Sequence, residues 1–446
     1  MDEHGARDDS PPRGDAPPAT LARRLGLGDA VALGLGSMIG AGVFAAFGPA
    51  AAAAGSGLLI GLVIAAMVAY ANATSSARLA AVYPESGGTY VYGRERLGPF
   101  WGFLAGWAFV IGKTASCAVM ALTFGSYVLP DHPRPPAAAA TLVLAAVNYF
   151  GVTKTARLTR ILLVVVLVAL AAVVVAATAG GAADPAHLTG WTDGGWYGVL
   201  QAAGLLFFAF AGYARIATLG EEVRDPERTI PRAVPIALGI AVAVYAVVGF
   251  SALLAVGPQV LAHSPAPLAA AASAGTLDVL EPAVRIGGAL ASLGVLLSLL
   301  AGIGRTSLAM ARRSDLPPWL AAVHPRYRVP HRAEVAVGLL VVGVVLLTDL
   351  RGAIGFSSFT VLLYYAVANA SAWTLPGRRA ARLLAAGGVA GCLLLALTLP
   401  VSSVLVGAGI VAVGALGRAA WRVHLKVRAR SGDGTVITSS INGEGT

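Results

Sequence analysis

The segment 34–44, Gly-Leu-Gly-Ser-Met-Ile-Gly-Ala-Gly-Val-Phe, decides the interpretation of this chain, because it places four glycines inside a long apolar stretch. A glycine weakens a helix interior by about 1 kcal/mol relative to alanine, so the cluster predicts a helix that is interrupted here. In a membrane, such a break is tolerated only where it is buried in protein or lines a cavity. Its free N–H and C=O groups suit a ligand that carries both an anion and a cation, as an amino acid does.

Composition indicates a membrane protein. Hydrophobic residues make up 57% of the 446 residues, and charged residues make up only 12%. Crossing the hydrocarbon core takes about 20 helical residues, and apolar runs near this length recur along the chain, which excludes a soluble protein with an apolar core. We predict an all-α integral membrane protein with twelve transmembrane helices. The predicted spans are 28–52, 57–80, 100–129, 137–152, 158–180, 197–221, 233–257, 284–310, 334–349, 354–375, 381–399 and 401–421.

The net charge of +10 is explained by topology rather than by nucleic-acid binding. Most of the 32 Lys and Arg residues fall on one side of the membrane if the N-terminus is inside, and this is the positive-inside pattern. Both termini are therefore predicted to be cytoplasmic, in a multi-pass protein of the plasma membrane, with the lipid bilayer and no nucleic acid as partner. Residues 1–24 and 423–446 are polar and compositionally biased, and we expect both tails to be disordered.

A second interrupted segment lies in the sixth span. Residues 204–213 read Gly-Leu-Leu-Phe-Phe-Ala-Phe-Ala-Gly-Tyr, five spans after the first segment and in the opposite orientation. Close packing of small residues is an alternative explanation for either cluster alone. A pair of interrupted helices at corresponding places in two inverted halves indicates a transporter binding site, so the pair favours that interpretation.

At these residues the chain resembles the amino acid–polyamine–organocation superfamily, over about residues 25–420. The resemblance rests on several motifs in the right order, in the segments 36–44, 84–107, 207–233 and 305–317. It implies a five-plus-five inverted-repeat (LeuT-like) core with discontinuous helices 1 and 6, followed by two added helices. The two repeats would be residues 25–180 and 181–378, and helices 11 and 12 would be residues 379–422.

The resemblance also implies secondary transport of amino acids by alternating access, with no enzymatic activity and no cofactor. The substrate carboxylate would meet the backbone N–H groups of Ala41 and Gly42, and its ammonium would meet carbonyls in both segments. The electrostatics of helix termini agrees, since a half-helix N-terminus carries about half a positive charge and unwound carbonyls supply the negative pole. The predicted substrate site consists of Ser37, Met38, Ile39, Gly40, Ala41, Gly42, Phe207, Phe208, Ala209, Phe210, Ala211 and Gly212.

The segment 216–223, Ile-Ala-Thr-Leu-Gly-Glu-Glu-Val, is most similar to the cationic amino acid transporter branch. Where such relatives often carry an acid, however, this chain has Ala214 followed by Arg215. A fixed cation near the site would repel a lysine or arginine substrate, unless the Arg215 side chain extends toward the cytoplasm. We therefore expect a neutral amino acid as substrate. A cationic or acidic amino acid, or a polyamine, exchanged by the same fold is the alternative.

Lys113 is the predicted ion-coupling residue. It lies thirteen residues into the third span, about 20 Å along a helix and deep in the bilayer. The chain uses arginine almost throughout, and a lysine can lose a proton whereas an arginine cannot. Intramembrane ionisable residues are functional candidates by default. We predict that Lys113 carries the coupling proton or substitutes for a bound sodium ion, with a purely structural role as the alternative. Sodium coupling ranks second because the hydroxyls of the eighth span have no acidic residue beside them.

A membrane-embedded transferase is the main alternative from another class of protein. That chemistry needs clustered carboxylates or histidines at a membrane face, whereas the seven histidines here are scattered over loops, span ends and the N-terminal tail. The sequence therefore favours a transporter without a metal site. Symport and exchange both stay open from the residues alone.

Overall fold

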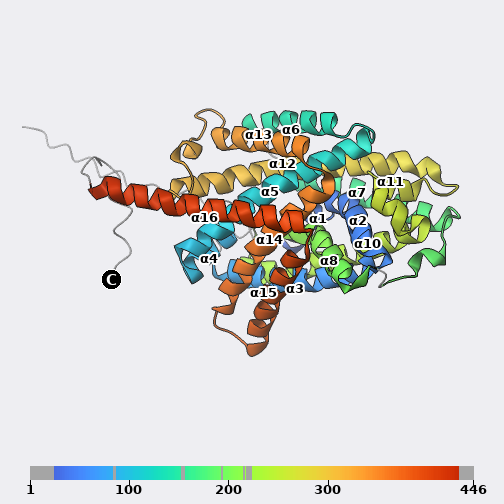
Figure 1. Ribbon diagram of the computed structural model, residues 1–446, viewed down its shortest axis with the longest axis horizontal. Helices are drawn as coiled ribbons and strands as arrows, with labels where there is room; N and C mark the ends of the chain where they lie inside the picture. Colours follow the sequence, from blue (N-terminus) through green and yellow to red (C-terminus); the bar gives the residue numbers. More distant parts are fainter. Residues whose placement is uncertain are drawn as a thin grey trace, which may run out of the picture.

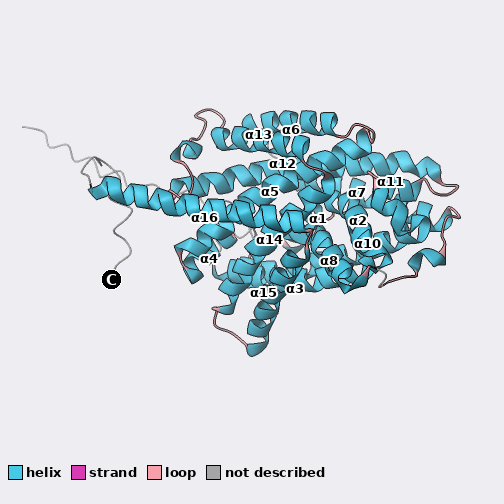
Figure 2. Cartoon of the chain, in the orientation of Figure 1, coloured by secondary structure: helices cyan, strands magenta, loops and turns pink. Residues whose placement is uncertain are grey.

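The computed structural model describes residues 25–83, 87–151, 156–191, 194–213, 216 and 223–430, and in these residues it consists of helices and connections without a strand (Figures 1 and 2). The predicted all-α class is confirmed. The α-helices are α1 Leu27–Met38, α2 Ala41–Ala54, α3 Leu58–Val82, α4 Thr89–Leu97, α5 Pro99–Val128, α6 Arg134–Tyr149, α7 Ala156–Ala179, α8 Gly195–Phe210, α10 Pro226–His263, α11 Pro267–Ala272, α12 Glu281–Arg312, α13 His331–Leu347, α14 Leu350–Trp373, α15 Arg379–Thr398 and α16 Val401–Arg430.

Each predicted span overlaps one of these helices, the first being formed by α1 and α2 together. Of the sixth predicted span, residues 214, 215 and 217–221 lie outside the described residues. Nine helical stretches of the described chain are long and apolar enough to cross a membrane. Helices α6 and α13 have 16 and 17 residues, fewer than the roughly 20 that a bilayer requires, and they lie side by side along one edge of the bundle (Figure 1). The count of twelve transmembrane helices, the inverted repeat and the cytoplasmic termini stay predictions.

Helices α10 and α16 extend furthest beyond the predicted spans. Helix α10 begins at Pro226, upstream of the predicted residue 233, and therefore includes Pro231. Helix α16 continues to Arg430 and past the boundary predicted at residue 422, and in Figure 1 it extends away from the bundle. Residues 423–430, which were predicted to belong to the C-terminal tail, are helical. Hydropathy detects only the part of a helix that faces lipid, and both extensions carry charged residues.

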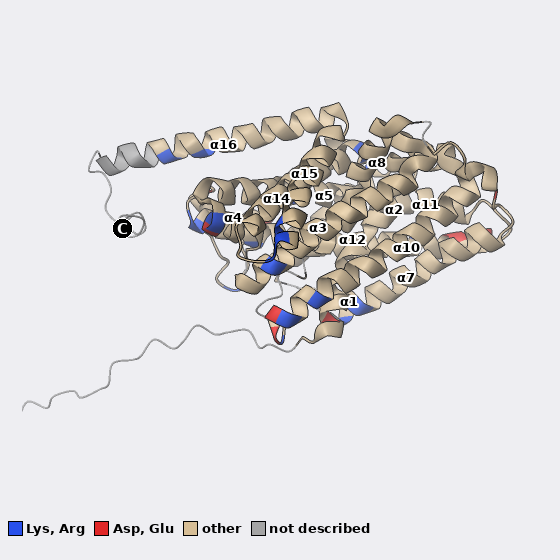
Figure 3. Cartoon of the chain, turned by 90° about the horizontal axis from the view of Figure 1, so that it is seen from below, with Lys and Arg blue, Asp and Glu red and all other residues tan. Residues whose placement is uncertain are grey.

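Lys and Arg gather toward one end of the bundle, which we call the basic end (Figure 3). It is formed by α4 and by the first turns of α1 and α7, where Arg160 pairs with Asp29 at 2.7 Å. This distribution agrees with the predicted positive-inside pattern. Between the second and third predicted spans, Thr89–Leu97 form the short helix α4.

A buried ion pair ties α16 to the basic end. The carboxylate of Asp315 accepts hydrogen bonds from Arg418 Nε at 2.9 Å and from the Tyr90 hydroxyl at 2.8 Å. Arg418 Nη2 donates to the carbonyl of Pro99 at 2.8 Å. Burial, and then the charge of Asp315, raises the pKa of Tyr90, so its hydroxyl keeps the proton that it donates. The network joins α4, the connection after α12 and the appended helix α16.

Candidate functional site

The first predicted interruption is present between α1 and α2. Helix α1 ends at Met38 and α2 begins at Ala41, while Ile39 (φ −77°, ψ 65°) and Gly40 (φ −122°, ψ −146°) leave helical geometry. The break is narrower than the glycine pattern predicted, because the rest of the segment 37–42 belongs to the adjoining helical turns. The first N–H groups of α2 have no partner within their own helix, and no side chain caps them.

The second predicted interruption lies at the end of α8. The α-helix stops at Phe210 and continues as a single 3₁₀ turn, Ala211–Tyr213. Residues Phe207 to Phe210 are therefore still helical. Ala214 and Arg215 lie outside the described residues, so the predicted charge near the site has no structural description.

The two interruptions pack so closely that their backbones are in contact. A Cβ atom at Gly42 would lie 2.8 Å from the Cα atom of Ala209. A Cβ atom at Gly212 would overlap the carbonyl oxygen of Ser37. Neither position has room for a side chain, so both glycines are what permits the close approach. The fold thus brings together the segments 37–42 and 207–212, which were predicted to share one site.

Two tyrosine hydroxyls bond to carbonyls of the interruptions, and neither tyrosine was predicted from the sequence. The hydroxyl of Tyr245, on α10, lies 2.6 Å from the carbonyl oxygen of Met38 and 3.0 Å from that of Ala209. The hydroxyl of Tyr365, on α14, donates to the carbonyl of Ala211 at 3.2 Å. A tyrosine inside an apolar span usually needs a hydrogen-bond partner. This need for a partner could have identified both tyrosines as candidate residues from the sequence. It could not have identified the carbonyls to which they bond.

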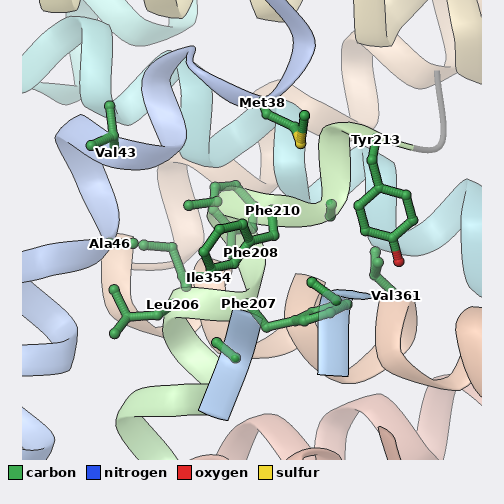
Figure 4. Close-up of a cluster of buried hydrophobic side chains, with 14 of the residues drawn as sticks. Met38, Val43, Ala46, Leu206, Phe207, Phe208, Phe210, Tyr213, Ile354 and Val361 are labelled. Carbon is green, nitrogen blue, oxygen red and sulfur yellow. The ribbon is translucent and has the colours of Figure 1, made fainter. Parts of the chain in front are cut away.

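The side chains around the interruptions are apolar. Figure 4 shows Phe207, Phe208 and Phe210 gathered with Met38 and Ile354 in one cluster. All five are buried, and Phe208 retains 8% exposure. An apolar lining of this kind suits an uncharged side chain, because a buried charge without a partner is strongly unfavourable.

A cavity of about 610 Å³ opens at the end of the bundle opposite the basic end. Its lining includes Ala45 on α2, one helical turn beyond Ala41, and reaches the turns at 131–135, 262–267 and 348–351. A second cavity, beside Ile39 and Gly40, holds about 10 Å³, which is no more than one water molecule requires. Ile39, Ala41 and Phe210 of the two interruptions are buried, and the large cavity reaches Ala45, one helical turn beyond Ala41.

Lys113 is buried on α5, with 9% of its surface exposed. Its helical neighbours face α14. The hydroxyls of Ser116 and Ser357 lie 2.7 Å apart, and a Cβ atom at Gly112 would overlap the side chain of Thr360. None of the ion pairs among the described residues includes Lys113. Its predicted burial is confirmed, and the residues beside it on α5, Gly112 and Ser116, pack against α14.

The family of this chain follows from a comparison of its sequence with models of known protein families. A model of the amino acid permease family matches residues 25–419. The chain belongs to this family. The resemblance to the amino acid–polyamine–organocation superfamily is thereby confirmed, and with it a transporter rather than an enzyme.

Relatives of this permease are also transporters. It is 60% identical to an uncharacterised transporter of Mycobacterium tuberculosis, over 93% of this chain and 95% of that protein. It is 26% identical to the branched-chain amino acid permease of Bacillus subtilis, over 72% of this chain and 74% of that protein. With cationic amino acid transporter 4 of Homo sapiens it shares 29% identity, over 78% of this chain and 58% of that protein.

Proposed function

We propose that this permease is a secondary active transporter of the plasma membrane that takes up a neutral amino acid by alternating access. The observation that carries the proposal is the backbone contact between the two interruptions. The N–H groups of Ala41 and Gly42 would bind the substrate carboxylate. The carbonyls of Met38, Ala209 and Ala211 would bind its ammonium.

The preference for a neutral amino acid rests on the side chains around this point. Phe208 and Phe210 offer apolar surface, and the buried cluster in Figure 4 carries no acidic residue among its labelled members. The relative named for branched-chain amino acids supports the same choice. A cationic amino acid is the second candidate, because another relative is named a cationic amino acid transporter.

Substrate counterflow tests the proposal. A thermal-shift screen of the purified protein against the twenty amino acids first selects a ligand. Proteoliposomes loaded with that amino acid should then accumulate it in labelled form without any ion gradient. Parallel counterflow assays use leucine as a neutral, lysine as a cationic and glutamate as an acidic amino acid. Accumulation of lysine alone would replace the neutral substrate by a cationic one, and no counterflow with any amino acid would contradict amino acid transport.

We propose further that uptake is coupled to protons through Lys113. Burial without an ion pair supports this role, because such a lysine is readily deprotonated, whereas an arginine is not. Lys113→Met should remove the dependence of uptake on an imposed pH gradient, and Lys113→Arg should remove it as well. Full pH-gradient dependence in Lys113→Met would contradict the assignment, and a dependence on a sodium gradient in the wild type would favour sodium.

A further inference from the structure

Glu334 is a buried acidic residue that the proposed transport site does not use. It lies in the first turn of α13, and only 5% of its surface is exposed. Its Oε2 atom is buried and has no hydrogen-bond partner. The four ion pairs found in the described part of the chain do not include it.

Helix α12 makes room for this carboxyl group. A Cβ atom at Gly304 would lie 3.1 Å from Glu334 Cγ and 3.3 Å from Pro330 Cγ. The next residue, Arg305, is exposed, and its guanidinium forms no ion pair with Glu334 within the described residues. On the α12 side, Glu334 Cγ therefore faces the backbone of Gly304, and the exposed Arg305 acts on the carboxyl group only as a nearby charge.

A second buried polar atom without a partner lies one turn earlier on the same helix. His331 Nδ1 has no hydrogen bond, and its ring lies 5.4 Å from the ring of His324 and 6.1 Å from that of Tyr149. His324, in the connection that precedes α13, accepts the backbone N–H of Arg326 at Nδ1, with 3.2 Å between the two nitrogen atoms.

The other charged and titratable groups near α13 come from several elements. On α13 itself Arg332 is exposed, and the preceding connection adds Arg326, Tyr327 and Arg328. Among the helices that pack against α13, α12 supplies Arg305, α6 supplies Tyr149, and α5 supplies Lys113, Cys117 and Tyr127. Lys154, on the α6–α7 connection, lies outside the described residues.

We propose that Glu334 is a proton-binding site and carries its proton in the folded protein. An ionised carboxylate in apolar surroundings without a partner is strongly unfavourable, and protonation removes that charge. A hard cation such as sodium would require several oxygen ligands, whereas Gly304 and Pro330 present carbon atoms to the side chain. The site is distinct from the two interruptions, so this inference does not rest on the proposed transport function.

Infrared spectroscopy of the purified protein in lipid tests the proposal directly. A protonated carboxyl group absorbs above the amide I band, and the band shifts when the sample is moved from water to deuterium oxide. We expect a band in the wild type that is lost in Glu334→Gln and displaced in Glu334→Asp. Glu281→Gln is the matched control, because Glu281 is ion-paired with Arg285 on α12, and it should keep the band. Equal band intensity in the wild type and Glu334→Gln would overturn the proposal.

Thermal unfolding gives an independent test. If Glu334 binds a proton more tightly in the folded state, the wild type loses stability as the pH rises through the range in which the site releases that proton. Glu334→Gln, which stays neutral, should keep its unfolding midpoint over that range. The proposal would be overturned if Glu334→Gln were less stable than the wild type at every pH above 6 and the stability of both proteins had the same pH dependence. That result would show that Glu334 is ionised in the wild type. Neither measurement uses transport, so failure here is distinguishable from failure of the proposed function.

Discussion

Replacing Tyr245 by phenylalanine tests whether its hydroxyl holds the two interruptions in register. The hydroxyl oxygen lies 2.6 Å from the Met38 carbonyl and 3.0 Å from the Ala209 carbonyl. A hydroxyl carries a single hydrogen, so the two carbonyls share one donor. The Tyr245 ring is 1% exposed and packs against Phe210 with 5.0 Å between ring centroids. Phenylalanine keeps this packing and removes only the donor.

When this hydroxyl is removed, the two buried carbonyls lose their hydrogen-bond donor, and this costs about 1–3 kcal/mol of free energy. If this cost falls on the transport-competent arrangement of the interruptions, kcat/KM for uptake should fall by roughly 5- to 150-fold. Initial rates in proteoliposomes at matched protein content measure this, with the amino acid selected by thermal shift as substrate. The thermal unfolding midpoint verifies that the variant is folded.

Tyr70→Phe is the matched control for Tyr245→Phe. Tyr70 lies on α3 with 49% of its surface exposed, so removal of its hydroxyl should leave uptake unchanged. An uptake efficiency of Tyr245→Phe within about twofold of the wild type would refute the reasoning, because twofold corresponds to less than the free energy of one buried hydrogen bond.

Two further substitutions test the packing described above. Gly42→Ala should abolish uptake in proteoliposomes, because the added Cβ atom would lie 2.8 Å from backbone of α8, whereas Gly302→Ala, with nothing within 4 Å, should transport normally. Wild-type uptake by Gly42→Ala would contradict the close approach. Asp315→Asn should lower the thermal unfolding midpoint, because removing one partner of a buried ion pair costs about 3–5 kcal/mol and leaves Arg418 without its carboxylate. The exposed Asp278→Asn is its control, and equal midpoints for the two variants would rule out a stabilising role for the pair.

The positions of the helices could be predicted because apolar length is a local property of the sequence. The predicted third span, 100–129, corresponds to α5 at Pro99–Val128. Prediction failed where a helix continues into polar sequence, as at the start of α10, which contains Glu227 and Arg228. There the helix is stabilised by packing against other helices rather than by the lipid, and hydropathy has no access to that packing.

The candidate site was found in part for the same reason. An excess of glycine is a local property of the sequence, so both interrupted segments could be located. In the first segment, only Ile39 and Gly40 leave helical geometry, and the break is therefore shorter than predicted. Tyr245 and Tyr365 come from helices distant in the sequence, and only the folded contacts identify their acceptors. Glu334 was missed because it begins an apolar run, where a solvent-facing position is the ordinary expectation for an acid.

The two tyrosines suggest how ligand binding and helix movement would be linked. Their hydroxyls already bond to the carbonyls of Met38, Ala209 and Ala211, which the proposed ammonium site would use. An ammonium has three donors and a full charge, and its hydrogen bonds are about twice as strong as those of a neutral hydroxyl. A carbonyl oxygen has two lone pairs, so a bound ammonium can share these acceptors with the tyrosine hydroxyls. The ligand would then join the two interruptions to α10 and α14 through common acceptors. Because a ligand shifts a conformational equilibrium only through its different affinity for the two states, this sharing of acceptors is where the required difference would arise.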